Sequence, residues 1–140
     1  MNEPTKIVDN DGTTRYILKG KLHRTDGPAV EYASGDRYWY QNGKIHRTDG
    51  PAIDCVNGSK HWVVNGKRHR MAGPAMDLAD GSKYWYVDGV LHRVDGPAVE
   101  NSNGDKEWYV DGKKIHLHTC KNFRADYPNL VNQLIEFATK

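Results

Sequence analysis

Aromatic and aliphatic residues alternate with polar ones along this chain in a pattern that repeats every 23 residues. The tryptophans share one position of the repeat: Trp39, Trp62, Trp85 and Trp108. Glycine keeps the same spacing, at Gly20, Gly43, Gly66, Gly89 and Gly112. A unit of this length cannot bury its own apolar face, so successive units are expected to stack into a linear array.

Each unit contains two tight-turn signals. The first recurs as Ser34-Gly35, Asn57-Gly58, Asp80-Gly81 and Asn103-Gly104, and the second as Asn42-Gly43, Asn65-Gly66, Asp88-Gly89 and Asp111-Gly112. Because Asn-Gly and Asp-Gly suit the two positive-φ positions of a type I′ turn, both signals predict two-residue β-hairpin loops. Gly12 and Tyr16 obey the same frame, so a degenerate first unit is predicted from about Thr5, which makes five units.

Counting outward from two-residue turns predicts the strand register. Trp39 then faces Val30 across one hairpin and His46 across the next, and one sheet face carries a Pro-Val-Trp-His stripe. The other face carries Ala29 and Tyr40 beside a recurring acid. Since both faces are half apolar, the sheet is expected to curl, to pack on another element or to pair with a second chain.

The repeat ends near residue 115, where Ile115 stands at the position of a recurring histidine. A helical stripe follows: Tyr127, Leu130, Val131, Leu134, Ile135 and Ala138. With Pro128 early and Asp126 as N-cap, this stripe predicts a C-terminal helix. The expected fold is therefore mainly β, an elongated or curled antiparallel meander of β-hairpin repeats (1–118), with a connector and a capping α-helix packed on it (119–140), in one structural domain.

Composition narrows the class of protein. The 140 residues include 20 Lys and Arg and 18 Asp and Glu, interleaved to a net charge of +2, so no basic run is present to clamp nucleic acid or an anionic membrane. No apolar stretch is long enough for a membrane span or a signal peptide, which favours a cytoplasmic location. Two cysteines at unrelated positions predict reduced thiols rather than a disulfide framework.

The recurring histidines His23, His46, His69 and His92 do not suit one shared metal ion. Equivalent residues lie at least two strands apart, roughly 10 Å, whereas zinc ligands lie within roughly 4 Å of one another. We interpret the histidines as structural, stacked beside the tryptophans with a ring N–H bonded to turn backbone. Since no catalytic motif occurs either, no catalytic residue, metal or cofactor is predicted, and His116 and His118 stay unassigned.

A recurring arginine admits two interpretations. Arg24, Arg47 and Arg93 are each followed two residues later by Asp and then by Gly-Pro. In the first, the Asp caps turn backbone and the Arg pairs with an acid across the sheet. In the second, the arginines form a ladder presented to phosphates or to an acidic partner. The third unit has Met71-Ala72 in place of Thr-Asp, so Arg70 is expected to lack its local acid.

The phrase W-x-x-N-G-K-x-H, present at 62–69, resembles MORN (membrane occupation and recognition nexus) repeats. The fuller phrase G-K-x-H-R-x-D-G-P-A more closely resembles MORN-like repeat proteins of bacteriophages and giant viruses. The resemblance covers roughly 5–114. The Arg after each recurring His, where the standard MORN unit has Gly, and the added Gly-Pro-Ala are departures from it. The resemblance implies a viral protein whose β-hairpin array serves as a binding scaffold.

The function expected from these features is protein binding without catalysis, through a Tyr-and-acid face or the sheet edge. The candidate residues of this face are Tyr40, Tyr86, Tyr109, Glu31, Asp54 and Asp77. The viral resemblance implies a host partner such as a defence nuclease, bound in the host cytoplasm; a homodimer through an apolar sheet face or edge is a further expectation. The alternatives are phosphate binding, of a nucleotide or nucleic acid, by Arg47, Arg70 and Arg93, and a lipid-surface scaffold as in MORN proteins.

Overall fold

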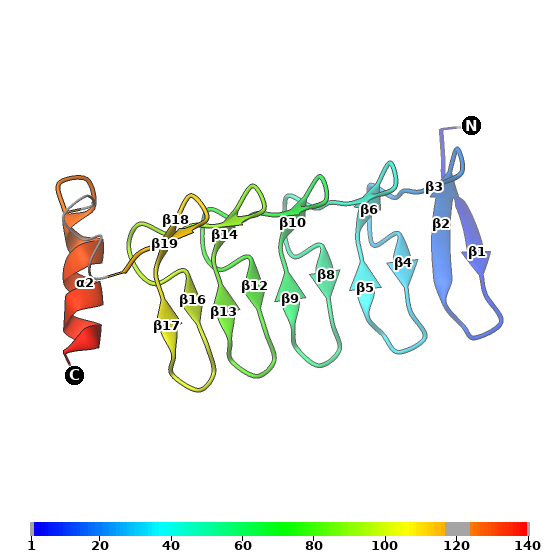
Figure 1. Cartoon of the computed structure of the whole chain (residues 1–140). Helices are drawn as coiled ribbons and strands as arrows, with labels where there is room; N and C mark the ends of the chain where they lie inside the picture. The colour runs from blue at the N-terminus through cyan, green and yellow to red at the C-terminus, as the bar shows by residue number, and fades with distance from the viewer. Residues whose placement is uncertain (1, 117–123, 140) are drawn as a thin grey trace.

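The computed structural model describes residues 2–116 and 124–139. This part of the chain is mainly β, with antiparallel hairpins and one C-terminal helix, as the sequence predicted. Figure 1 shows the units side by side in an elongated row, with the N-terminal hairpin at one end and the helix at the other. None of the helices in the described part is both long and apolar enough to cross a membrane.

One sheet of 11 strands runs through the array. It begins with β1 (Thr5–Val8) and β2 (Thr14–Leu18), and β3 (Lys21–Leu22) pairs with β2. Four long hairpins continue it: β4 (Val30–Glu31) with β5 (Arg37–Tyr38), β8 (Ile53–Asp54) with β9 (Lys60–His61), β12 (Met76–Asp77) with β13 (Lys83–Tyr84), and β16 (Val99–Glu100) with β17 (Lys106–Glu107). The β1 strand forms an edge, and all its residues are exposed.

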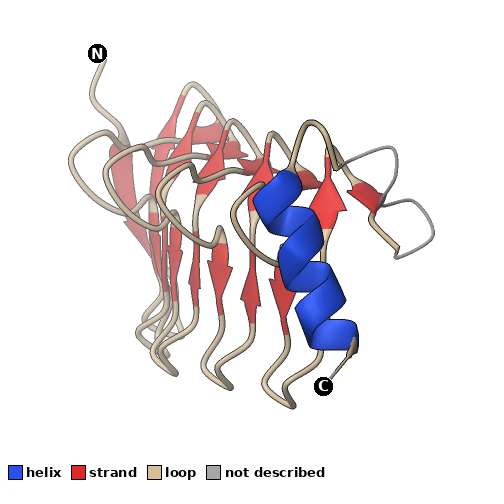
Figure 2. Ribbon diagram, turned by 90° about the vertical axis from the view of Figure 1, so that its left-hand side faces the viewer, coloured by secondary structure: helices blue, strands red, loops and turns tan. Residues whose placement is uncertain are grey.

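A short hairpin follows each long one. These pairs are β6 (Tyr40–Gln41) with β7 (Lys44–Ile45), β10 (Val63–Val64) with β11 (Lys67–Arg68), β14 (Tyr86–Val87) with β15 (Val90–Leu91), and β18 (Tyr109–Val110) with β19 (Lys113–Lys114). Figures 1 and 2 show the short hairpins gathered along one side of the row, at the ends of the long strands.

The two turn signals fold differently. In the short hairpin, Asn42 and Gly43 both have positive φ, 51° and 80°, and Gln41 pairs with Lys44, so the two-residue turn is confirmed. In the long hairpin only Gly35 has positive φ, and the Tyr32 N–H donates to the Asp36 carbonyl, which leaves a three-residue loop. A type I turn followed by a left-handed glycine builds such loops.

The extra loop residue shifts the register of the long hairpins by one. Val30 pairs with Tyr38, not with Trp39, so the predicted Pro-Val-Trp-His stripe is wrong for this half of the unit. A one-residue slip moves each side chain to the opposite face. Across the short hairpin the prediction is confirmed, because the His46 N–H donates to the Trp39 carbonyl.

This register produces a row of alternating charge across the long sheet. Each residue of the row pairs with the next one in the order Glu31, Arg37, Asp54, Lys60, Asp77, Lys83, Glu100 and Lys106. Asp54 accepts from Lys60 Nζ at 3.0 Å and from Arg37 Nη2 at 3.3 Å. Opposite charges directly across a sheet stabilise the pairing, so the recurring acids are neutralised within the array.

The interior of the array is thin. Its most deeply buried repeat position is an alanine with 0% exposure in all four units: Ala29, Ala52, Ala75 and Ala98. Side chains also join successive turns, as when Ser59 Oγ accepts the Ala79 N–H and Ser82 Oγ accepts the Ser102 N–H. The same polar link between neighbouring turns therefore recurs along the array and holds the units together where apolar burial is small.

Helix α2 (Pro128–Ala138) packs on the last unit. Its N-cap is Tyr127 and not the predicted Asp126, because the residue directly before Pro128 takes the non-helical conformation. Leu130, Val131 and Leu134 are buried in the helix–sheet contact, whereas Ala138 is exposed. The predicted boundary between 118 and 119, and His118, lie outside the described residues.

Candidate functional site

Each recurring arginine is the second residue of the loop that follows a short hairpin, as Arg47 is in the loop between β7 and β8. Its guanidinium carbon lies over the aromatic ring eight residues earlier. The distances to the ring centroid are 4.0 Å for Arg24 on Tyr16, 4.0 Å for Arg47 on Trp39, 3.7 Å for Arg70 on Trp62 and 3.9 Å for Arg93 on Trp85. Cation–π stacking therefore covers each ring with the next loop.

The same guanidinium also holds the loop closed. Arg47 Nη1 donates to the Pro51 carbonyl at 3.0 Å, and Arg47 Nε donates to Asp49 Oδ1 at 2.8 Å. This ion pair lowers the pKa of Asp49, chiefly through the hydrogen bond from Arg47. Arg24 and Arg93 repeat both bonds with their own Pro and Asp.

Glycine in the Gly-Pro step leaves room for the guanidinium. A Cβ atom on Gly50 would lie 2.8 Å from Arg47 Cζ, and the corresponding distances are 2.8 Å at Gly27 and 2.7 Å at Gly96. The arginine is therefore enclosed by an aromatic ring and a bare backbone. This arrangement explains why Arg and Gly recur together at a spacing of three.

The geometry supports the structural interpretation of Arg47 and Arg93, with one change of partner. The nearest acid is the Asp two residues on, which accepts from Nε. An acid on the long sheet is a second partner in two units, where Arg93 Nη1 lies 3.0 Å from Glu100 and Arg24 Nη1 lies 3.7 Å from Glu31. Among the arginines proposed to bind phosphate, Arg70 is therefore the one whose guanidinium is not paired with an Asp of its own loop.

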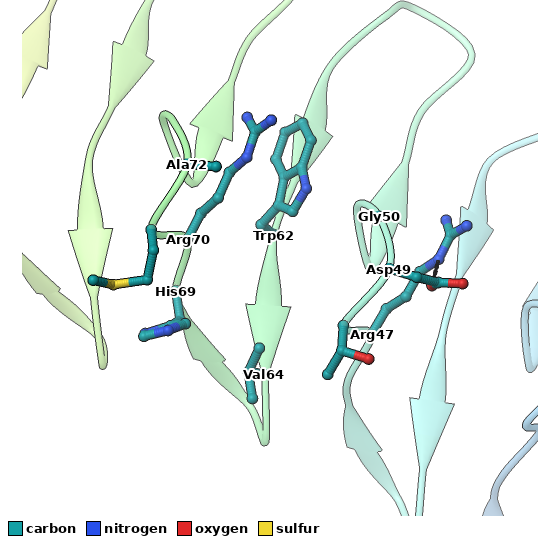
Figure 3. A pocket seen from close by; sticks show the side chains of 10 residues that line it. Arg47, Asp49, Gly50, Trp62, Val64, His69, Arg70 and Ala72 are labelled. Atoms are coloured by element: carbon teal, nitrogen blue, oxygen red, sulfur yellow. Dashed lines mark hydrogen bonds and ion pairs between the residues drawn. The ribbon is translucent and has the colours of Figure 1, made fainter.

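Arg70 departs from its equivalents as its sequence predicted. It stacks on Trp62, and its Nη1 donates to the Pro74 carbonyl at 3.1 Å, but Ala72 supplies no carboxylate. Throughout the described chain, no acceptor for Arg70 Nε is found. Figure 3 shows the contrast: Asp49 is bonded to Arg47, whereas the equivalent residue near Arg70, Ala72, ends in a methyl group.

A groove of about 750 Å³ lies between the loops of Arg47 and Arg70. The equivalent grooves on either side measure about 430 Å³ and 350 Å³. Val64 lines the large groove, as Val87 lines one neighbouring groove, whereas Gln41 lines the other. Met71 stands where the two preceding units have Thr25 and Thr48, and it is 78% exposed. We call this site, lined by Trp62, Val64, Arg70, Met71 and Ala72, the central groove (Figure 3).

Sequence reasoning identified Met71 and Ala72 as departures from the repeat but did not identify Val64. Met71 and Ala72 were visible because each differs from the residues at its position in the two preceding units. Val64 gave no such signal, because Val87 and Val110 occupy the same position and Gln41 is the exception. Identical positions serve the scaffold in every unit, whereas a departure in one unit changes one groove.

The recurring histidines link one short hairpin to the next. His23 Nδ1 accepts the Asn42 N–H at 3.0 Å, and His46, His69 and His92 make the equivalent bond to Asn65, Asp88 and Asp111. A hydrogen bond from the ring to turn backbone was predicted, but in these bonds the ring nitrogen is the acceptor and the backbone N–H is the donor. The partner atom in each bond is a backbone N–H, which can only donate, so Nδ1 is the acceptor.

The candidate tyrosines and acids belong to different hairpins. Tyr40, Tyr86 and Tyr109 are half-buried on the short hairpins, and burial raises the pKa of Tyr40. The acids Glu31, Asp54 and Asp77 belong to the charged row of the long sheet, where Asp77 accepts from Lys83 at 2.9 Å. Their charges are therefore already matched by neighbouring cations.

Among residues 2–116 and 124–139, no group of three His, Cys, Asp or Glu side chains is arranged to hold a metal ion. Cys55 is a free thiol, and its burial raises its pKa, which disfavours the reactive thiolate. Cys120 lies outside the described residues. The loops and grooves described above are thus the candidate site of this chain.

In comparisons with known proteins, no family model and no curated protein matches the chain.

Proposed function

We propose that this protein is a non-enzymatic binding module that engages another protein through the central groove. The carrying observation is the combination of an exposed Met71, an apolar wall and an arginine without its local acid, in the largest of the equivalent grooves. Aromatic residues, Met and Arg are the types enriched where proteins bind one another.

The scaffold suits this role. Equivalent side chains recur along the row, so the units present a rigid, extended surface on which one unit can be specialised without altering the others. The resemblance to viral MORN-like proteins suggests a host protein, such as a defence nuclease, as the partner class. A partner of that kind places the protein in the host cytoplasm.

Capture of partners from a host extract tests the proposal. Met71→Asp puts a charge in the central groove, and Val56→Asp makes the same change at another exposed apolar residue, 67% exposed, in the turn between β8 and β9. We expect Met71→Asp to lose a partner that the wild type and Val56→Asp both retain. Loss by neither variant, or by both alike, would contradict the central groove as the binding site.

Salt separates this function from phosphate binding. A contact made by Trp62, Val64 and Met71 should change little in affinity between low and moderate salt. Nucleic acid held by the arginines should instead weaken with a slope of nearly one log unit of affinity per log unit of salt for each phosphate contacted. A steep slope would therefore favour the phosphate alternative.

A further inference from the structure

Four arginine loops of this chain provide four versions of one site, and three of them contain a carboxylate. Nε of the arginine donates to Asp26, Asp49 and Asp95 at 2.9, 2.8 and 2.9 Å. In the remaining loop the position of the carboxylate is left open by Ala72. Three loops thus show that a carboxylate is the group that accepts a hydrogen bond from this side of the guanidinium.

The guanidinium of Arg70 is held ready for such a group. Its ring contact with Trp62 is the shortest of the four, 3.7 Å, and its bond to the Pro74 carbonyl matches the others. Because these two contacts hold the side chain, an incoming acceptor does not have to order it, which favours binding.

The open position is accessible from solvent. The side chains of Asp26, Asp49 and Asp95 are 84%, 83% and 82% exposed while they accept from Nε. A carboxylate on another molecule can therefore take the same position at Arg70 without any movement of the loop.

Charge favours a single carboxylate over a phosphate. The charged residues that line the central groove are Arg47, Asp49 and Arg70, so the net charge is +1 − 1 + 1 = +1. The positive charge of Arg47 is matched by Asp49 at 2.8 Å. One unmatched guanidinium complements one negative charge, and the lining offers no lysine for a second.

An exposed ion pair alone contributes little affinity, so a carboxylate needs help from its neighbour. Met71 and Val64 supply an apolar wall next to Arg70 in the same groove. We propose that the central groove binds an Asp or Glu side chain of a partner protein together with a large apolar side chain beside it. This inference rests on the proposed function and specifies its ligand.

The test uses displayed heptapeptides selected on the intact wild-type protein and then synthesised with blocked ends. Ala72→Asp restores the internal carboxylate and is expected to fold, since Asp occupies this position in three loops. Ala79→Asp is the matched control, an exposed residue of the same unit in the turn between β12 and β13. Arg70→Lys, which keeps the charge but lacks Nε–H, is the second variant if Ala72→Asp does not fold.

We expect the selected peptides to contain Asp or Glu beside a large apolar residue. Ala72→Asp, Arg70→Lys and a Glu→Gln or Asp→Asn change in the peptide should each weaken binding about tenfold or more, and Ala79→Asp less than about twofold. In ¹⁵N spectra the Arg70 Nε–H signal should move on adding peptide. In Ala72→Asp without peptide it should already resemble the Arg47 signal.

Peptides that lack an acid, or that bind Ala72→Asp as well as the wild type, would overturn the inference. If those peptides are lost by Met71→Asp, the proposed groove function stands and only the carboxylate is wrong. If they are unaffected by Met71→Asp, or if no peptide is enriched, both fail. Stronger competition by inorganic phosphate than by acetate would also overturn the choice of a carboxylate.

Discussion

The tryptophan that recurs in each unit is covered in one way in the interior of the array and in another way at its C-terminal end. Trp39, Trp62 and Trp85 are half-buried, each beneath an arginine of the next loop. Trp108 is only 3% exposed and packs in a cluster with Ile115, Leu130, Val131 and Leu134. The ring of Phe137 lies 5.3 Å from that of Trp108.

The difference follows from two residues in the last unit. Ile115 stands where the other units have histidine, and His116 where they have arginine. Ile115 still donates its N–H to the Trp108 carbonyl, so the backbone frame continues while the chemistry changes. Stacking of an arginine on a tryptophan can be repeated, because each unit supplies both the ring and the arginine loop that covers it. The apolar cluster around Trp108 instead ends the row.

The largest expected effect is on the tryptophans themselves. Trp108→Ala removes a fully buried ring and should lower the free energy of unfolding by about 3–5 kcal/mol, and Trp62→Ala, half-exposed beneath Arg70, by about 2–3 kcal/mol. Urea denaturation monitored by circular dichroism measures both. A larger loss for Trp62→Ala would contradict the contrast between the two ends, and an unchanged stability would show that the Trp62 ring is functional rather than structural.

Arg47→Met tests whether the stacking of an arginine on a tryptophan stabilises the array. The variant keeps an apolar stem over Trp39 but loses the guanidinium contact with the ring and the bond to the Pro51 carbonyl. It should lose about 1–3 kcal/mol of unfolding free energy. Lys44→Met, at an exposed position of the adjacent strand, is the control and should change stability by less than about 0.5 kcal/mol. Equal effects would show that the guanidinium is dispensable.

The Gly-Pro steps of the Arg47 loop and the Arg70 loop should differ in their tolerance of a side chain. Gly50→Ala places a Cβ 2.8 Å from Arg47 Cζ, and that arginine is also held by Asp49, so we expect a loss of about 1–3 kcal/mol. In Gly73→Ala the distance to Arg70 Cζ is 3.2 Å, and no Asp restrains the side chain. The loss should be below about 1 kcal/mol. The melting temperatures of the two variants measure this difference. A larger decrease for Gly73→Ala than for Gly50→Ala would contradict the inference that Arg70 is less restrained than Arg47.

The smallest effect concerns pH. Burial lowers the pKa of His61 below 6.5, with a smaller contribution from Arg68, so the unfolded chain binds a proton more readily than the folded one. Stability from this group is therefore present above about pH 6.5 and is lost as pH falls toward the folded pKa. His61→Tyr, the residue found at positions 38 and 84, should remove this part of the pH dependence.

Unfolding free energies of wild type and His61→Tyr between pH 7 and pH 5 provide the measurement. The advantage of the variant should grow as the pH falls. Parallel profiles would contradict a depressed pKa for His61.

One dipeptide shows how far local sequence reaches. Asn65-Gly66 forms the predicted type I′ turn with both residues at positive φ, whereas in Asn57-Gly58 only the glycine has positive φ. Asn57 instead accepts the Ser59 N–H with its side chain, in a three-residue loop. Because the two turns share the same letters, the difference could not be predicted from the dipeptide, and the register of every long hairpin followed from it.

The sequence by itself determined the 23-residue period, the hairpin units and the closing helix, because these depend on spacing and on residue types that recur in every unit. It also marked Arg70 as an exception, since a missing Asp is visible in the letters. Only the tertiary structure decided the pairing of Val30 with Tyr38, the direction of the histidine bonds and the stacking of Arg47 between Trp39 and Gly50. These depend on how one loop meets the ring and the turn of another, a distance in space that a period along the chain does not specify.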